Sequence, residues 1–157
     1  MENESKYMIE IDHLSKSFQT IHAVDDLTFR VKRGELFAFL GLNGAGKSTT
    51  ISMMCGQLKK DAGSITIDGI NLDGNVELIK NEIGVVFQQS GLDDALSVYD
   101  NLKYRAGLYG ITGKDFETRY EKMAELLDFK DLKKRPLGKL SGGQHRRIDI
   151  ARALLHE

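Results

Sequence analysis

Short apolar or alternating stretches, separated by polar residues or glycine, recur through the first ninety residues. Runs of this length and period predict β-strands. We expect five strands, at residues 7–11, 27–31, 36–40, 64–68 and 83–87. The last of these, with the sequence IGVVF, is almost continuously apolar, which is typical of a strand buried on both faces.

Helical periodicity lies between these strands and is the dominant pattern from about residue 97. In residues 47–58 the apolar side chains follow the spacing i, i+3, i+4, i+7, which predicts one buried face. They are Ile51, Met54, Cys55 and Leu58. Three later helices are each expected to begin at a pair that resembles a capping box. The pairs are Ser97 with Asp100, Thr112 with Asp115, and Ser141 with Gln144.

Strands mixed with helices, followed by helices alone, predict an α/β fold with a helical insertion. We expect one domain over residues 1–157, with a β-rich part at about 1–90 and a helical part at about 91–157. The inward side chains of the last two helices repeat every three or four residues. They are Phe116, Tyr120, Met123 and Leu127 in one helix and Ile148, Ala151 and Leu155 in the other.

The strand expected at 36–40 runs into the sequence GLNGAGKST, which fits the phosphate-binding pattern G-x-x-x-x-G-K-[ST]. Glycines in such a loop let successive backbone N–H groups wrap a phosphate, and the helix N-terminus adds positive potential. Lys47 would reach the β- and γ-phosphates, and Ser48 would offer its hydroxyl to Mg²⁺. The plainer alternative is a glycine-rich turn before an unrelated lysine. The residues of this phosphate loop are Gly41, Leu42, Asn43, Gly44, Ala45, Gly46, Lys47, Ser48 and Thr49.

A second helix start with an affinity for anions lies one hundred residues further on, at Leu140-Ser141-Gly142-Gly143-Gln144. A serine hydroxyl and two glycines expose polar groups at the positive end of a helix. An ordinary capped helix explains the same residues, so this segment alone does not decide between the two readings.

Taken together, the motifs GLNGAGKST, then VVFQQ at residues 85–89, then LSGGQ followed by RRIDIARALLHE resemble the ATP-binding domain of ABC transporters. The resemblance covers essentially the whole chain. It implies a P-loop NTPase core with an N-terminal antiparallel β subdomain and a helical insertion. It also implies a head-to-tail dimer, in which the signature residues Ser141, Gly142, Gly143 and Gln144 of one subunit cap ATP on the phosphate loop of the other.

The same resemblance assigns roles to single residues. Phe18 matches the aromatic that stacks on adenine, although a strand aromatic in the core would look the same. Gln88 matches the glutamine that approaches Mg²⁺ and the attacking water, and the adjacent Gln89 is the alternative. Gln88 and Lys47 are therefore the candidate catalytic residues, and Ser48 and Gln88 are the candidate metal ligands.

The segment 91–111 resembles the exporter branch of the family, which includes drug- and antibiotic-resistance ATPases. This resemblance implies an integral-membrane permease subunit as partner, and a cytoplasmic location at the inner face of the membrane. The apolar residues expected to meet that partner, or else to lie in a helix core, are Leu92, Leu96, Val98 and Tyr99.

Composition adds few constraints. The chain has 22 Lys and Arg against 23 Asp and Glu, so no nucleic-acid partner is expected. A single cysteine excludes an intramolecular disulfide and a cysteine-based zinc site. The basic residues between 130 and 147 are interpreted as a solvated face, except that Arg146 and Arg147 oppose the dipole of their helix and call for salt bridges or an anion.

Phosphoryl transfer also needs a carboxylate for Mg²⁺ and a group that acts on the attacking water. In the family both lie just beyond the sequence ARALLHE, so we expect an N-terminal fragment that lacks the C-terminal core strands and is inactive by itself. Two alternatives remain open: a soluble ABC ATPase not linked to transport, and a non-hydrolysing nucleotide-binding module. A GTPase is disfavoured because no N-K-x-D motif is present.

Overall fold

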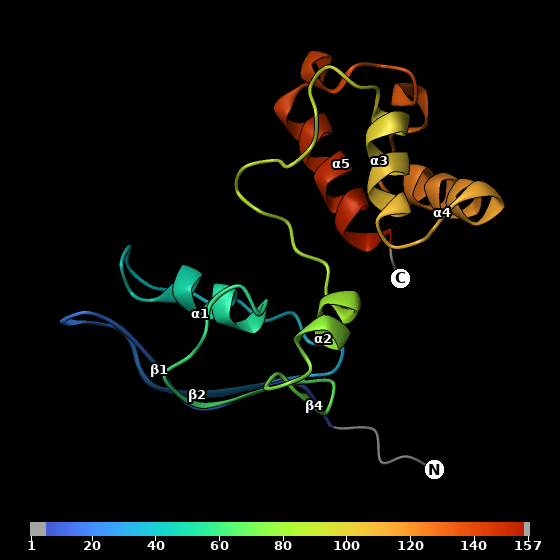
Figure 1. Cartoon of the computed structure of the whole chain (residues 1–157). Helices are drawn as coiled ribbons and strands as arrows, with labels where there is room; N and C mark the ends of the chain where they lie inside the picture. The colour runs from blue at the N-terminus through green and yellow to red at the C-terminus, as the bar shows by residue number, and fades with distance from the viewer. Residues whose placement is uncertain (1–5, 156–157) are drawn as a thin grey trace, which may run out of the picture. The chain divides into compact units, whose positions relative to one another are not determined.

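The computed structural model describes residues 6–155, except for the side chain of Asn81. The chain forms two compact units, which meet in sequence between Glu82 and Ile83, and each is described by itself (Figure 1). No helix among the described residues is both long and apolar enough to cross a bilayer.

The first unit is built on a four-stranded antiparallel sheet with the order β2-β1-β3-β4. A long hairpin of β1 (Tyr7–Phe18) and β2 (Ile21–Lys32) is joined by β3 (Ala62–Ile67) and the short β4 (Ile70–Asn71). Helix α1 (Lys47–Met54) lies over one face of this sheet, and α2 (Val76–Glu82) follows β4 (Figure 1). The side chains of Ile11, Leu14, Met53 and Ile65 are fully buried between them.

The second unit is helical. It contains α3 (Val98–Gly107), α4 (Gly113–Leu126) and α5 (Gly142–Leu154), with short 3₁₀ turns at Lys130–Leu132 and Leu137–Lys139. Several aromatic rings in its core contact one another edge to face. The inward positions expected for α4 and α5 are buried or partly buried, as predicted. The aromatic residues of this core are Tyr99, Phe116, Tyr120 and Phe129.

Two of the five expected strands are wrong as secondary structure. Residues 36–40 and 83–87 form no sheet in the described chain, because a strand needs a neighbour to bond its backbone and none pairs with them. Phe37 and Phe39 nevertheless stack on Phe29 of β2, with ring centres 5.1 and 5.6 Å away, while Leu36 and Leu40 on the alternate positions are 99% and 87% exposed. The two-sided burial expected of 83–87 is also wrong, since Phe87 is 44% exposed.

Smaller departures concern helix ends. Helix α1 stops at Met54 rather than at residue 58, and its buried side chains are Thr50 and Met53, whereas Ile51 is exposed. The predicted cap of α4 does not form: Thr112 makes no side-chain cap bond, and Asp115 instead pairs with Arg119 at 3.1 Å. The caps at Ser97 and Ser141 are present.

One glycine of the sheet is set by close backbone approach. Gly63 in β3 has φ +83°, and a Cβ there would lie 2.3 Å from the carbonyl oxygen of His13 and 2.5 Å from that of Asp12. Gly74 has nearly the same backbone, φ +81°, but a Cβ there would meet nothing within 4 Å. A side chain at either position would strain the backbone, but only a side chain at Gly63 would also collide with neighbouring atoms.

We therefore expect Gly63→Ala to destabilise the chain by about 1–3 kcal/mol more than Gly74→Ala, the usual cost of forcing atoms into packed space. Both variants carry the same left-handed strain, so their difference isolates the contact between β1 and β3. Urea unfolding of the two variants measures it, and equal midpoints would contradict the close approach.

Candidate phosphate-binding site

The phosphate loop enters α1 through two glycines with left-handed backbones, Gly44 at φ +87° and Gly46 at φ +77°. Gly46 also has no room for a side chain, because a Cβ there would lie 2.2 Å from the carbonyl oxygen of Ala23 and 3.1 Å from Val24. Both the conformation and the contact with β2 therefore require glycine at residue 46. Val24 itself is a buried core residue.

Lys47 is folded back over the loop that precedes it. Its Nζ donates hydrogen bonds to the carbonyl oxygens of Gly41, at 2.7 Å, and Leu42, at 2.6 Å. Behind it the buried Thr50 hydroxyl donates to the carbonyl of Gly46 at 3.0 Å, which closes the first turn of α1. The lysine thus ties both ends of the loop together and holds its ammonium group beside the helix N-terminus.

These residues enclose a polar cavity of about 200 Å³. Its lining comes from β2, the loop and the first turn of α1: Ala23, Asn43, Gly44, Gly46, Lys47, Ser48 and Thr49. Lys47 and Ser48 are among the lining residues, at the positive end of a helix, a combination that suits a phosphate group. Gly41 and Leu42 do not line the cavity; their carbonyls accept from Lys47, and the Leu42 side chain is exposed.

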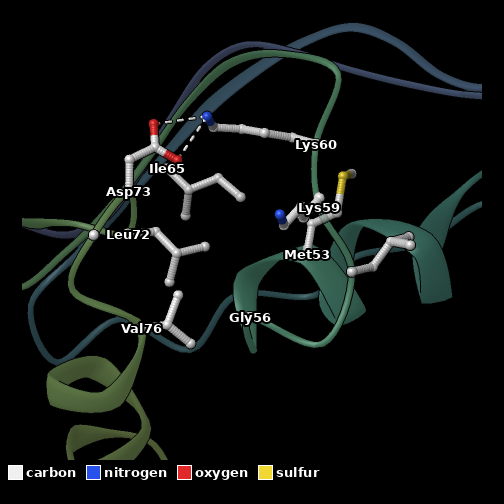
Figure 2. A pocket seen from close by; sticks show the side chains of 10 residues that line it. Met53, Gly56, Lys59, Lys60, Ile65, Leu72, Asp73 and Val76 are labelled. Atoms are coloured by element: carbon white, nitrogen blue, oxygen red, sulfur yellow. Dashed lines mark hydrogen bonds and ion pairs between the residues drawn. The ribbon is translucent and has the colours of Figure 1, made fainter.

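A second cavity of the first unit differs in chemistry (Figure 2). It measures about 280 Å³ and is lined mainly by apolar side chains from α1, β3 and the approach to α2. One of its two lysines, Lys60, donates to both carboxylate oxygens of Asp73, at 2.9 and 2.7 Å, so that the charge of Lys60 is already compensated. The smaller, polar cavity is the better candidate for an anion.

Phe18 stands at the end of β1, on the hairpin that supplies Ala23 to the polar cavity. Its cross-strand partner is Ile21, two residues before Ala23. The ring is 45% exposed, so it is not a core side chain, and the Lys16 ammonium lies 5.6 Å from its centre. Lys16 in turn donates to Asp61 at 2.6 Å, and this bond, with one from the Ser17 N–H, holds the pKa of Asp61 below its usual value.

The signature motif forms a complete capping box at the start of α5. The Gln144 N–H donates to the Ser141 hydroxyl at 3.3 Å, and the Ser141 N–H donates to the Gln144 side-chain oxygen at 3.0 Å. A Cβ at Gly142 or Gly143 would meet nothing within 4 Å. The first turn of α5 therefore presents open backbone beside its cap.

Gln88 and Gln89 are both exposed and lie in the irregular segment before α3. The two arginines that opposed the helix dipole have partners: Arg146 donates to the carbonyl of Phe87 at 2.8 Å, and Arg147 to the carbonyl of Asp128, also at 2.8 Å. An acceptor at each arginine offsets the unfavourable dipole. Each of the two arginines thus has an acceptor within the second unit.

Comparison with known proteins identifies the family. The family model described as "ABC transporter" matches residues 24–157, most of the chain. The chain belongs to the ABC transporter family. Its antiparallel N-terminal sheet and the helices that follow match the solved ABC ATPase structures, which confirms the fold class expected from the sequence.

Two curated relatives and one solved structure show how far the likeness extends. The chain is 37% identical to "Methionine import ATP-binding protein MetN 1" of Listeria monocytogenes, covering 96% of this chain and 47% of that protein. It is 35% identical to "Linearmycin resistance ATP-binding protein LnrL" of Bacillus subtilis, covering 96% of this chain and 48% of that protein. The solved cbiO1 of Clostridium perfringens, described as part of the ABC transporter complex cbiONQ, is 29% identical with a TM-score of 0.86, over 97% of this chain and 62% of that one. The chain thus spans about half the length of these curated relatives.

The sequence did not point to every residue of the site. Ala23 lines the polar cavity beside the phosphate loop through its backbone, and no side-chain pattern in the sequence marks such a role. The contacts of Asp149 and Ser90 in the second unit, 2.8 Å apart, join residues 59 positions distant in sequence. The sequence carries no signal for this hydrogen bond, because a buried carboxylate can find its hydroxyl partner anywhere along the chain.

We expect Phe18→Ala to weaken binding of an adenine nucleotide by about 1–3 kcal/mol, the range for stacking of a base on an aromatic ring. Phe18→Tyr should have a mild effect because the stacking face remains. Equilibrium binding of a fluorescent ATP analogue measures both variants, and thermal unfolding provides the control. A loss of stability with unchanged affinity would contradict the stacking role.

Proposed function

We propose that this chain binds Mg²⁺–ATP on the phosphate loop and, within the complete protein, takes part in ATP hydrolysis that drives transport. The observation that carries the proposal is the polar cavity at Gly44, Gly46 and Lys47, on a chain of the ABC transporter family. In that reading the loop N–H groups and Lys47 hold the phosphates, and Phe18 stacks on adenine.

Magnesium fits the residues present. The Ser48 hydroxyl lines the cavity and has no hydrogen bond to another described residue, so it is available as an oxygen ligand. Gln88, also exposed, would supply the second protein oxygen and orient the attacking water. Bound Mg²⁺ would neutralise charge on the β- and γ-phosphates.

We further propose a head-to-tail dimer and a permease partner. The open backbone at Gly142 and Gly143 supports the first, because it leaves donors free for a phosphate on another subunit. For the second, the expected contact Val98 is fully buried and belongs to the core, but Tyr104, Leu108 and Tyr109 at the end of α3 are exposed. Through such a permease the chain would sit at the cytoplasmic face of the membrane.

Export is the transport direction that we propose, supported by the segment 91–111 alone. The names of the relatives include both an import protein and a resistance protein, so they favour neither direction. A permease identified by co-purification with the complete protein, and its substrate flux in vesicles, would decide the direction.

Lys47→Ala should weaken binding of a fluorescent ATP analogue at least tenfold, or about 1.4 kcal/mol. The change removes the ammonium group beside the cavity and both bonds to the loop. Lys59→Ala is the matched control, since Lys59 lines the second cavity. Equal affinity of a folded Lys47→Ala variant and wild type would overturn the proposed phosphate site.

The 157-residue chain is expected to bind ATP without turning it over. The residues proposed for this site, Lys47, Ser48 and Gln88, include no carboxylate, whereas positioned acids and bases supply orders of magnitude in rate. Phosphate release under saturating ATP measures this. Steady hydrolysis that Lys47→Ala abolishes would contradict it.

A further inference from the structure

Helix α5 follows the segment 84–94 along its length and bonds to its backbone. Near the C-terminal end of α5, a Cβ on Gly84 would lie 2.2 Å from the carbonyl oxygen of Ala153. The backbone of the segment and that of the helix are therefore in contact there. One residue earlier in α5, Arg152 donates to the carbonyl of Val85 at 2.6 Å. The helix and this segment thus run together before Gln88 is reached.

Two contacts then bracket Gln88. On one side Arg146 donates to the carbonyl of Phe87 at 2.8 Å. On the other, the Ser90 hydroxyl donates to the carboxylate of Asp149, which is 5% exposed, at 2.8 Å. The same Ser90 oxygen accepts the Leu92 N–H at 3.2 Å, which extends the hold past the glutamines.

His145 adds a third contact on the same face of α5. Its ring nitrogens lie 3.5 Å from Asp149 and 3.6 Å from Asp94, so the protonated ring would pair with both carboxylates. By contrast, the side chains of Gln88 and Gln89 make no hydrogen bond or ion pair with other described residues. The backbone is therefore held on both sides of two glutamines whose side chains stay available.

From this arrangement we infer that Arg146 and Asp149 are positioning residues for Gln88, an inference that rests on the role proposed above for that glutamine. Both stand on the helix that begins with the signature motif. Because α5 is a rigid rod with a rise of 1.5 Å per residue, a shift of its N-terminus moves these anchors together. Gln88 is thus tied, through the residues on either side of it, to the helix that carries the signature motif.

Arg147 offers a matched control. It is the same residue type, one position along the same helix, but it donates to the backbone carbonyl and the carboxylate of Asp128, at 2.8 and 3.1 Å. Loss of Arg147 removes a surface contact of α5 without touching the segment that holds Gln88.

The first measurement is backbone order from ¹⁵N relaxation of the 157-residue chain. We expect the Phe87–Ser90 amides to have order parameters near the rigid value of about 0.85 and to fall below about 0.6 in Arg146→Gln, but not in Arg147→Gln. Arg146→Lys should recover part of the order. Ser90→Ala removes the other anchor through one hydroxyl and serves if Arg146→Gln does not fold.

The second measurement is the ratio of ATP affinity with Mg²⁺ to that with EDTA, which a purely structural contact would not change. Arg146→Gln should lower this ratio at least threefold, and Arg147→Gln should leave it within the error of the wild type. Unchanged order at residues 87–90, or lost order with an unchanged ratio, would overturn the inference. A wild-type ratio of one would instead refute the proposed metal role of Gln88, and the relaxation data would still decide whether α5 holds the segment.

Discussion

The approach of Gly46 to the carbonyl of Ala23 is the contact on which the phosphate site depends. It brings the N-terminus of α1 against β2 with no side chain between them, since a Cβ would come within 2.2 Å of that oxygen. Everything else in the site is placed relative to this point. Lys47 is the next residue and can reach back to the loop, and Ala23 becomes one wall of the cavity.

That contact also places the cavity beside the hairpin that carries Phe18, the residue proposed to stack on adenine. The strand that supplies Ala23 begins at Ile21, which pairs with Phe18. The register of β1 and β2 therefore carries an exposed aromatic to within a few residues of the cavity wall. Lys16 and Asp61 brace this end of β1, because Asp61 binds both the Lys16 ammonium and the Ser17 N–H. The lowered pKa of Asp61 means that this brace contributes stability above the ordinary Asp pKa and loses it as the pH falls through the folded value.

Local patterns predicted the parts of this fold that local physics determines. The phosphate loop, the cap at Ser141 and the inward stripe of α4 each depend on residues within a few positions of one another. The cap at Thr112 does not form, and the Asp115 side chain pairs with Arg119 on its own helix, a partner that the capping pattern does not reveal. The anchors on either side of Gln88 lie about sixty residues away from their partners in sequence, and no spacing rule reaches that far.

The segment 36–40 has the alternating pattern of a β-strand but does not pair with any strand of the described chain. Its alternation is real: Phe37 and Phe39 stack on Phe29 of β2, and Leu36 and Leu40 face the other way. Stacking of rings on one face is thus enough to set the period of two without any ladder of backbone bonds. A ladder needs a second strand alongside, and Leu36 and Leu40 leave apolar side chains exposed on the other face of this segment. The alternating pattern therefore gives the segment two apolar faces. One packs on Phe29 of β2, and the other is left exposed by the described residues.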